Sequence, residues 1–187
     1  MNTQNKIVLS VPPDLRFTAT VENFVDIVAP HFNMDKHDKD IHILRSILNE
    51  AFVNVIRHTE SDLENPVEII FEIDTPRLFI HFTDRGKGIA LQDHYPPYPQ
   101  EFVGQFFTVL STIDGEVMAY VKDRNTIELS FKEIDISGLD QSELLKNARP
   151  GGMGLSLIVK LMDEVRFVFT ENEGNCLQIS KFFHKLG

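Results

Sequence analysis

The chain has 187 residues, and 42% of them are hydrophobic, including fifteen phenylalanines. This length suits one domain, 1–187, and the composition supplies a sizeable core, which argues against intrinsic disorder. The formal net charge of −10 would repel phosphate backbones and anionic lipids, so nucleic acid and membranes are not expected partners. A single cysteine, Cys176, excludes an intrachain disulfide, and no apolar run reaches the roughly 20 residues of a membrane span. We therefore expect a cytoplasmic protein.

Hydrophobic periodicity predicts a strand, two helices and a hairpin in the first half of the chain. The expected elements are a strand over 6–11, a helix over 18–32, a longer helix over about 36–59, and a hairpin of strands 67–73 and 77–83. The longer helix carries one narrow apolar stripe, formed by Leu44, Leu48, Ala51 and Val55. This stripe predicts that the helix packs on a core along that face.

A long insert interrupts the second half of the chain before regular elements resume. The expected elements are a hairpin of 116–121 and 126–131, a short helix over 142–147, a helix after Gly152, and strands 165–170 and 176–183 around a turn at 173–175. Phe102, Phe106 and Phe107 are expected to pack on the domain, because three exposed rings would form a sticky patch. Strands joined by hairpins, with the helices grouped elsewhere, predict an α+β two-layer sandwich and disfavour a doubly wound parallel sheet.

Three polar residues share one side of the longer predicted helix. Glu50, Asn54 and His58 lie at positions i, i+4 and i+8, one turn apart. The carbonyl oxygen of Asn54 suits Mg²⁺, and the carboxylate of Glu50 can accept a proton or orient an attacking hydroxyl. Asn54 is therefore a candidate metal ligand and Glu50 a candidate catalytic residue. A solvated polar face explains the same residues, and this helix alone does not separate the two interpretations.

Two glycine-rich segments flank the insert. Asp84-Arg85-Gly86-Lys87-Gly88 directly follows a predicted strand, and its glycines allow close approach of a ligand. Gly151-Gly152-Met153-Gly154-Leu155 opens a helix, whose free N–H groups and positive dipole end can bind phosphate. Each segment alone also fits an ordinary turn. The second segment is not a Walker A loop, because no Gly-Lys-Ser/Thr follows it.

The order and setting of these segments resemble the N, G1 and G2 boxes of the GHKL ATPases. The resemblance sharpens toward the anti-sigma-factor serine kinases of the RsbW and SpoIIAB type, because Glu50-Ala51 followed by Asn54 and Arg57-His58 looks like the N box of that branch. The helix that begins at Gly152-Met153-Gly154-Leu155 and continues to Val165 is similar to its G2 helix. The similarity covers about 7–84 and 150–183. It implies a Bergerat fold, with a mixed, mostly antiparallel sheet covered on one face by helices and an extended lid over 89–149.

The resemblance also implies a role for each matching residue. Asp84 would hydrogen-bond the adenine amino group of ATP, Asn54 would bind Mg²⁺, and Glu50 would activate a substrate serine. The other nucleotide-binding residues would be His58, Gly86, Gly88, Arg149, Gly152, Gly154 and Leu155. Arg149 stands one residue further from the glycines than the lid arginine of such kinases. The insert is also much longer than is usual in this family.

The implied function is that of an ATP-dependent protein serine/threonine kinase in a partner-switching pathway. Its implied partners are an anti-sigma-factor antagonist as substrate, a sigma factor, and a second copy in a homodimer. Two other classes stay open, namely an ATP-binding regulatory or anti-sigma module without phosphoryl transfer and a stand-alone histidine-kinase catalytic domain. The carboxylate of Glu50 favours a kinase over a pure binding module.

Overall fold

The computed structural model describes residues 5–35, 37–58, 65–134 and 153–183. In chain order the elements within these ranges are β1 (Asn5–Val11), η1 (Leu15–Phe17), α1 (Thr18–Asn23), α2 (Val25–Val28), η2 (Ala29–Phe32), α3 (Lys39–His58), β2 (Val67–Asp74), β3 (Arg77–Asp84), η3 (Gln100–Phe102), β4 (Phe106–Thr112), β5 (Gly115–Asp123), β6 (Thr126–Glu133), α5 (Met153–Leu161), β7 (Glu164–Thr170) and β8 (Gly174–Phe182).

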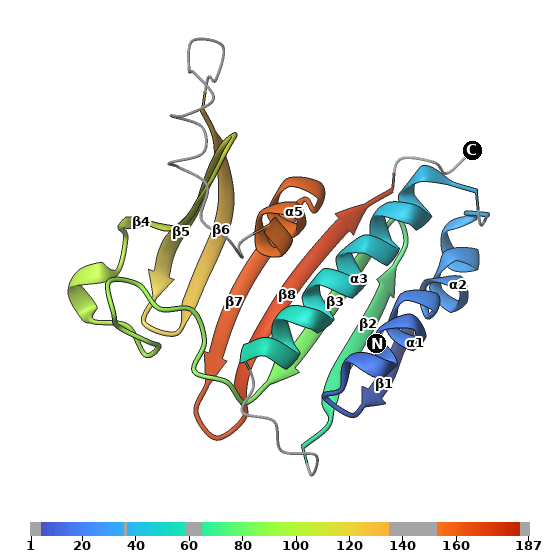
Figure 1. Cartoon of the computed structure of the whole chain (residues 1–187), viewed down its shortest axis with the longest axis horizontal. Helices are drawn as coiled ribbons and strands as arrows, with labels where there is room; N and C mark the ends of the chain where they lie inside the picture. Colours follow the sequence, from blue (N-terminus) through green and yellow to red (C-terminus); the bar gives the residue numbers. More distant parts are fainter. Residues whose placement is uncertain (1–4, 36, 59–64, 135–152, 184–187) are drawn as a thin grey trace.

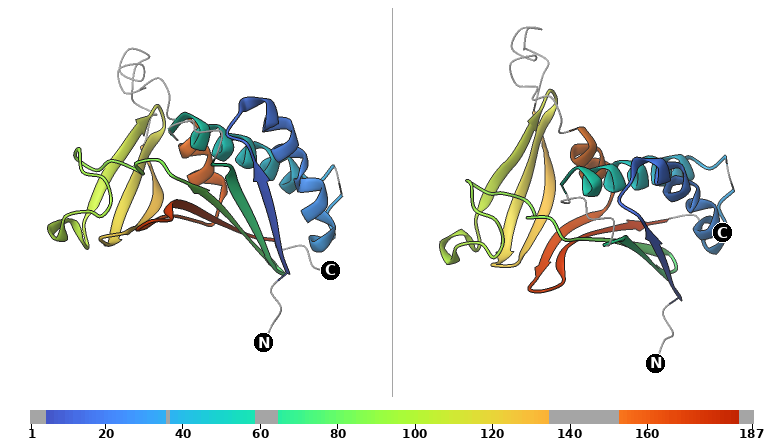
Figure 2. Two further views of the ribbon diagram at one scale, coloured as in Figure 1. Left: turned by 90° about the horizontal axis from the view of Figure 1, so that it is seen from below. Right: turned by 60° about the horizontal axis from the view of Figure 1, so that its bottom comes forward.

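The strands form one sheet in the order β1-β2-β3-β8-β7-β6-β5-β4. Each pairing between these described strands is antiparallel. The helices lie on one face of the sheet (Figure 1). Figure 2 shows that β4, β5 and β6 curve away from the plane of the other strands, toward the side on which the helices lie. The predicted α+β two-layer sandwich is confirmed.

The core lies between the sheet and the helices because each element presents one apolar face to the other. In β2 the alternate residues Val67, Ile69, Phe71 and Ile73 are buried, as a half-covered strand requires. The predicted stripe of α3, formed by Leu44, Leu48, Ala51 and Val55, is buried as well. Full burial of one such large side chain stabilises the fold by about 1.5–3 kcal/mol. The opposite face of α3 is left for polar residues.

The helix predicted over 18–32 is broken into α1, α2 and η2. Pro30 stands in the first turn of η2, and a proline has no N–H to donate to the preceding turn. The chain therefore tightens into a 3-10 turn there instead of continuing as an α-helix. Asn33 ends the segment in the left-handed conformation, with φ of 54°.

The described part of the insert continues the main sheet. The predicted hairpin appears as β5 and β6, and residues 126–129 of β6 pair with residues 165–168 of β7. The sequence did not predict β4, which adds a further strand outside β5. The turn predicted at 173–175 begins earlier, because Gly174 and Asn175 already belong to β8. The short helix predicted over 142–147 lies outside the described residues.

The three phenylalanines of the insert do not share one environment. Phe102 and Phe107 are buried, with ring centroids 4.6 Å apart. Phe106 is 64% exposed, so the prediction that it packs on the domain is wrong. The reason is the alternation of β4, which directs neighbouring side chains to opposite faces.

Candidate functional site

The polar side of α3 faces the start of α5. Glu50 and Asn54 are half-buried, and a methyl group placed on Gly154 would overlap the Glu50 carboxylate and lie 3.3 Å from Nδ2 of Asn54. Two predicted segments that are a hundred residues apart in the sequence are therefore in contact. Only a residue without a side chain fits at position 154 while these two side chains keep their places.

The negative charge of Glu50 lies next to the positive end of the α5 helix dipole at this contact. Gly154 is the second residue of α5, and the N-terminal turn of a helix has free N–H groups and a partial positive charge. A carboxylate oxygen of Glu50 already lies at this point. The arrangement is one in which anionic oxygen atoms are favoured, whether they come from Glu50 or from a bound phosphate.

The end of β3 forms a second group of candidate residues. Leu78, Ile80 and Phe82 alternate as the buried residues of β3, so Asp84 points to the same, helix-covered face. An oxygen of the Asp84 carboxylate accepts a 2.6 Å hydrogen bond from the N–H of Gly86. This bond bends the chain directly after the strand and holds the carboxylate at the entrance to the glycine-rich loop.

Gly88 needs to be a glycine for two reasons. Its φ is +81°, which L side chains rarely adopt. A methyl group at this position would also lie 2.7 Å from Oδ1 of Asn175 and 3.0 Å from Cγ of Pro96. The loop from Asp84 to Gly88 is thus packed closely against β8 and against Pro96 of the insert.

Asn175 is a site residue that the sequence did not single out. It is fully buried and stands directly opposite Asp84 in the β3–β8 ladder. Its Nδ2 donates to the carbonyl of Gly86, whereas its buried Oδ1 has no hydrogen-bond partner among the described residues. An unpaired buried acceptor typically costs about 1–3 kcal/mol, so a donor from a ligand or water would be favoured there. Asn175 can be recognised as a candidate site residue only from its pairing with Asp84 across the two strands.

The remaining predicted residues are placed only in part. Leu155 lies on α5, half-buried and packed against the core. His58 is the last residue of α3, and its side chain is outside the description. Arg149 and Gly152 lie outside the described residues. The roles assigned to all of these residues stay predictions.

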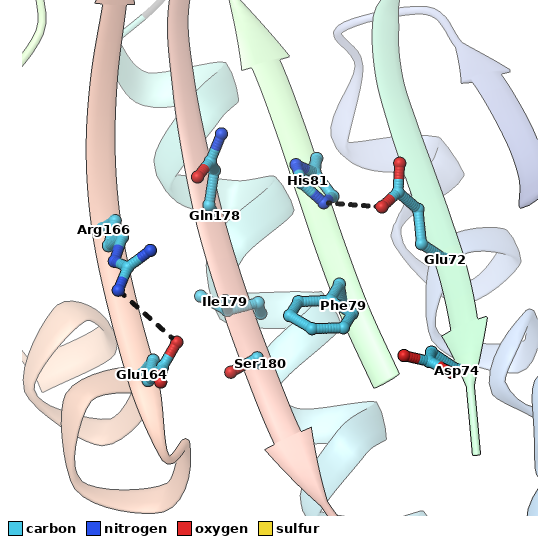
Figure 3. A pocket seen from close by; sticks show the side chains of 9 residues that line it. All are labelled: Glu72, Asp74, Phe79, His81, Glu164, Arg166, Gln178, Ile179 and Ser180. Carbon is cyan, nitrogen blue, oxygen red and sulfur yellow. Dashed lines mark ion pairs between the residues drawn. The ribbon is translucent and has the colours of Figure 1, made fainter. Parts of the chain in front are cut away.

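A separate groove of about 320 Å³ lies on the opposite, helix-free face of the sheet, where Figure 3 shows helices behind the strands. Arg166 and Glu164 form an ion pair in this groove at 3.8 Å, and Nε2 of His81 lies 3.8 Å from Oε2 of Glu72. Burial lowers the pKa of His81, and the Glu72 carboxylate opposes that shift. The groove holds none of the predicted site residues.

The family model for the histidine kinase-like ATPase domain matches residues 11–181. The chain belongs to this family. The resemblance is thereby confirmed at the level of the GHKL-type ATPases, while its serine-kinase branch stays a prediction. A search of curated proteins finds no significant match. In the described part of the chain, no helix is long and apolar enough to cross a membrane.

The residues of this histidine kinase-like ATPase domain fit an adenine nucleotide. A carboxylate, a glycine-rich loop and an unpaired buried amide oxygen meet where β3 and β8 lie side by side. At the start of α5, Gly154 approaches Asn54 without a side chain. Among the described residues, no cluster of three or more His, Cys, Asp or Glu could hold a metal ion. A cation at Asn54 would therefore take further oxygen ligands from the nucleotide and from water.

Proposed function

We propose that this domain binds Mg·ATP between α3, the end of β3 and the start of α5. Asp84 accepts a hydrogen bond from the adenine amino group, and Gly86 and Gly88 allow the base to approach the backbone. Asn54 binds Mg²⁺, and Gly152 and Gly154 present backbone N–H groups to the phosphates. The observation that carries the proposal is the contact of Gly154 with Glu50 and Asn54. This contact brings the polar side of α3 next to the glycine-rich N-terminus of α5, and a helix N-terminus of this kind can bind phosphate.

His58, Leu155 and Arg149 complete the proposed nucleotide site. His58 is the last residue of α3, and Leu155 follows Gly154 on α5. Arg149 would contact the terminal phosphate, where a guanidinium can donate two hydrogen bonds to phosphate oxygens. These assignments follow from family resemblance and from position in the chain.

The proposed reaction is phosphoryl transfer from ATP to a serine or threonine hydroxyl of a protein. Bound Mg²⁺ would neutralise phosphate charge. Glu50 accepts the proton of the substrate hydroxyl. The hydroxyl oxygen forms a bond to the γ-phosphorus of ATP, and the bond between that phosphorus and the ADP oxygen breaks. The position of the Glu50 carboxylate at the start of α5 supports this role, since the carboxylate is held beside the place proposed for the phosphates.

The proposed substrate is an anti-sigma-factor antagonist, in a pathway where the kinase also binds a sigma factor and forms a homodimer. An acidic chain with a formal net charge of −10 favours partners with basic surfaces. This charge argument supports a protein partner without identifying it.

Nucleotide binding can be tested first, because every later step depends on it. Calorimetry with Mg·ATP and Mg·ADP should detect binding to the wild type, and Asp84→Ala should weaken it by at least about tenfold, or 1.4 kcal/mol. Asp74→Ala, at the exposed end of β2, is the matched control and should bind normally. Wild-type protein that binds neither nucleotide would exclude the proposal as a whole.

The catalytic role of Glu50 needs a separate experiment. Glu50→Gln keeps the shape of the side chain but cannot take up a proton, so ATP affinity should change little. Transfer of labelled phosphate to a partner serine should fall by about 10²–10⁴. Phosphohistidine in the product would favour the histidine-kinase alternative, and nucleotide binding without any transfer would favour the regulatory module.

A further inference from the structure

Strand β4 forms one edge of the sheet. It pairs with β5 on one side and stands last in the strand order of the described residues. The strand begins after a bulge at Gly104, whose φ is +84°. There the N–H of Gly104 donates to the carbonyl of Val121, and the N–H of Val121 donates to the carbonyl of Gln105, which is the pattern of a glycine bulge.

This bulge determines which backbone groups of β4 point outward. The carbonyl of Gln105 faces β5, and the backbone groups of successive residues alternate in direction along an antiparallel strand. Phe107, which pairs with Ala119 in the same register, therefore also faces β5. The N–H and carbonyl groups of Phe106 and Thr108 point away from β5, toward the open edge.

The two edges of the sheet differ in how they resist pairing with another strand. At the other edge, β1 contains Lys6 and is followed by Pro12 and Pro13, which are residues that protect an edge. Strand β4 has the sequence FFTVLST, without charge or proline. A register shift between Thr108 and Leu110 interrupts the ladder, so the regular open stretch is the first half of β4.

An exposed aromatic pair lies beside this open stretch. Phe106 is 64% exposed, and its ring centroid is 4.9 Å from that of Tyr120 on β5. A strand added outside β4 would place a side chain next to Phe106 on the same face. Aromatic residues in such a position supply much of the contact area of an interface.

We propose that β4 is a docking edge for a protein partner, which adds an extended basic segment to the sheet through Phe106 and Thr108. The negative charge of the insert indicates that the segment bound at this edge is basic. Residues 89–134 contain seven acidic and three basic side chains, which gives a net charge of −4. Two of the acidic side chains pair with bases outside this range, Asp114 with Lys160 and Glu128 with Arg166, and the insert is still negative when these two bases are included. A second copy would present the same uncharged strand with the same acidic surroundings, so its net charge opposes self-pairing. The proposal does not depend on nucleotide binding.

A synthetic decapeptide that alternates valine with lysine serves as the probe. Its addition to the full chain should slow amide exchange at Phe106 and Thr108 by at least about tenfold and leave Val8 of β1 unchanged. The equivalent peptide with glutamate in place of lysine should have no effect. Absence of protection by the lysine peptide, equal protection by the glutamate peptide, or equal protection of β1 would each overturn the proposal.

Two variants test the β4 edge without changing the rest of the fold. Thr108→Pro removes an outward N–H, and Phe106→Ser removes the exposed ring, so each should weaken binding of the lysine peptide by at least about tenfold with an unchanged circular dichroism spectrum. Val8→Ser, at a 54% exposed apolar residue of the other edge, is the control and should bind the peptide normally. If the wild type alone sediments as a dimer and Thr108→Pro as a monomer, the occupant is a second copy and the proposal is wrong.

Discussion

The contact between Gly154, Glu50 and Asn54 limits which side chain position 154 can carry. The side chains of α3 fill the space in which a side chain at position 154 would lie. At the other end of the site, the amide of Asn175 on β8 donates to the carbonyl of Gly86 and holds the loop from Asp84 to Gly88 against β8. Both contacts join segments that are far apart in the sequence.

A Gly154→Ala substitution tests the first contact without relying on any activity. In most helices this change stabilises the fold by up to about 1 kcal/mol, because glycine is a poor helix former. Here the added methyl group meets the Glu50 carboxylate, which is the movable end of a half-buried side chain. Its displacement should cost about 1 kcal/mol, at the lower end of the range for overpacking. We therefore expect urea denaturation to show that the usual gain in stability is lost.

The control for this substitution is the same change in a Glu50→Ala background, where the obstructing carboxylate is absent. The usual gain in stability from Gly154→Ala should then be restored at least in part, which a double-mutant cycle measures as coupling between the two residues. Equal changes in stability in both backgrounds would mean that residues 50 and 154 do not interact as the structure describes.

At the scale of elements, strongly periodic segments were predicted well and irregular ones were not. Helix α3 was expected over about 36–59 and spans Lys39–His58. At the N-terminus of this helix, the carboxylate of Asp38 accepts a hydrogen bond from the N–H of Asp40. Strand β4 was missed because the bulge after Thr108 interrupts its alternation. Asn175 was missed because its role depends on its partner across the ladder, Asp84, and no local pattern encodes that pairing.

The insert is joined to α5 by a polar contact between elements. Nζ of Lys160 on α5 lies 2.6 Å from Oδ2 of Asp114, in the turn between β4 and β5. The same ammonium group lies over the ring of Phe131 on β6, 4.1 Å from its centroid. A helix that carries candidate phosphate-binding residues thus contacts the insert.

This contact should make stability depend on pH in a defined direction. The hydrogen bond from Lys160 is the main cause that holds the pKa of Asp114 below its usual value. The stabilisation is therefore fully present above the unfolded pKa of about 3.9, and it is lost as the pH falls through the lowered pKa of the folded state. Because both side chains are partly exposed, a cycle of Asp114→Asn and Lys160→Met should give only about 0.2–1 kcal/mol of coupling at pH 7.

The same cycle on Lys122 and Glu128, an exposed pair within the β5–β6 hairpin, is the control that does not link the insert to α5. Amide exchange in α5 should rise in the Lys160→Met variant and stay unchanged in Lys122→Met. A coupling between Asp114 and Lys160 that keeps its full size below the folded pKa would show that it does not come from the charge of the Asp114 carboxylate.

For the whole molecule, the question is whether the insert moves as a lid or remains part of the sheet. A lid over 89–149 would use Gly86 and Gly88 as hinges, yet Gly88 is packed against Asn175 and Pro96. Closure of the described part would also disturb the pairing of residues 126–129 with residues 165–168. We therefore expect residues 92–134 to stay in place when nucleotide binds.

Hydrogen exchange with and without saturating Mg·ATP tests this expectation directly. Exchange should slow at residues 84–88 and in the last turns of α3, where the proposed site lies, because ligand contacts and lost solvent access both reduce opening of the backbone. Exchange over 92–134 should be the same in both conditions, as should exchange in the distant strand β1. Protection over 92–134 that clearly exceeds protection of β1 would instead identify the whole insert as a nucleotide-responsive lid, since loops that close over a ligand become ordered with it.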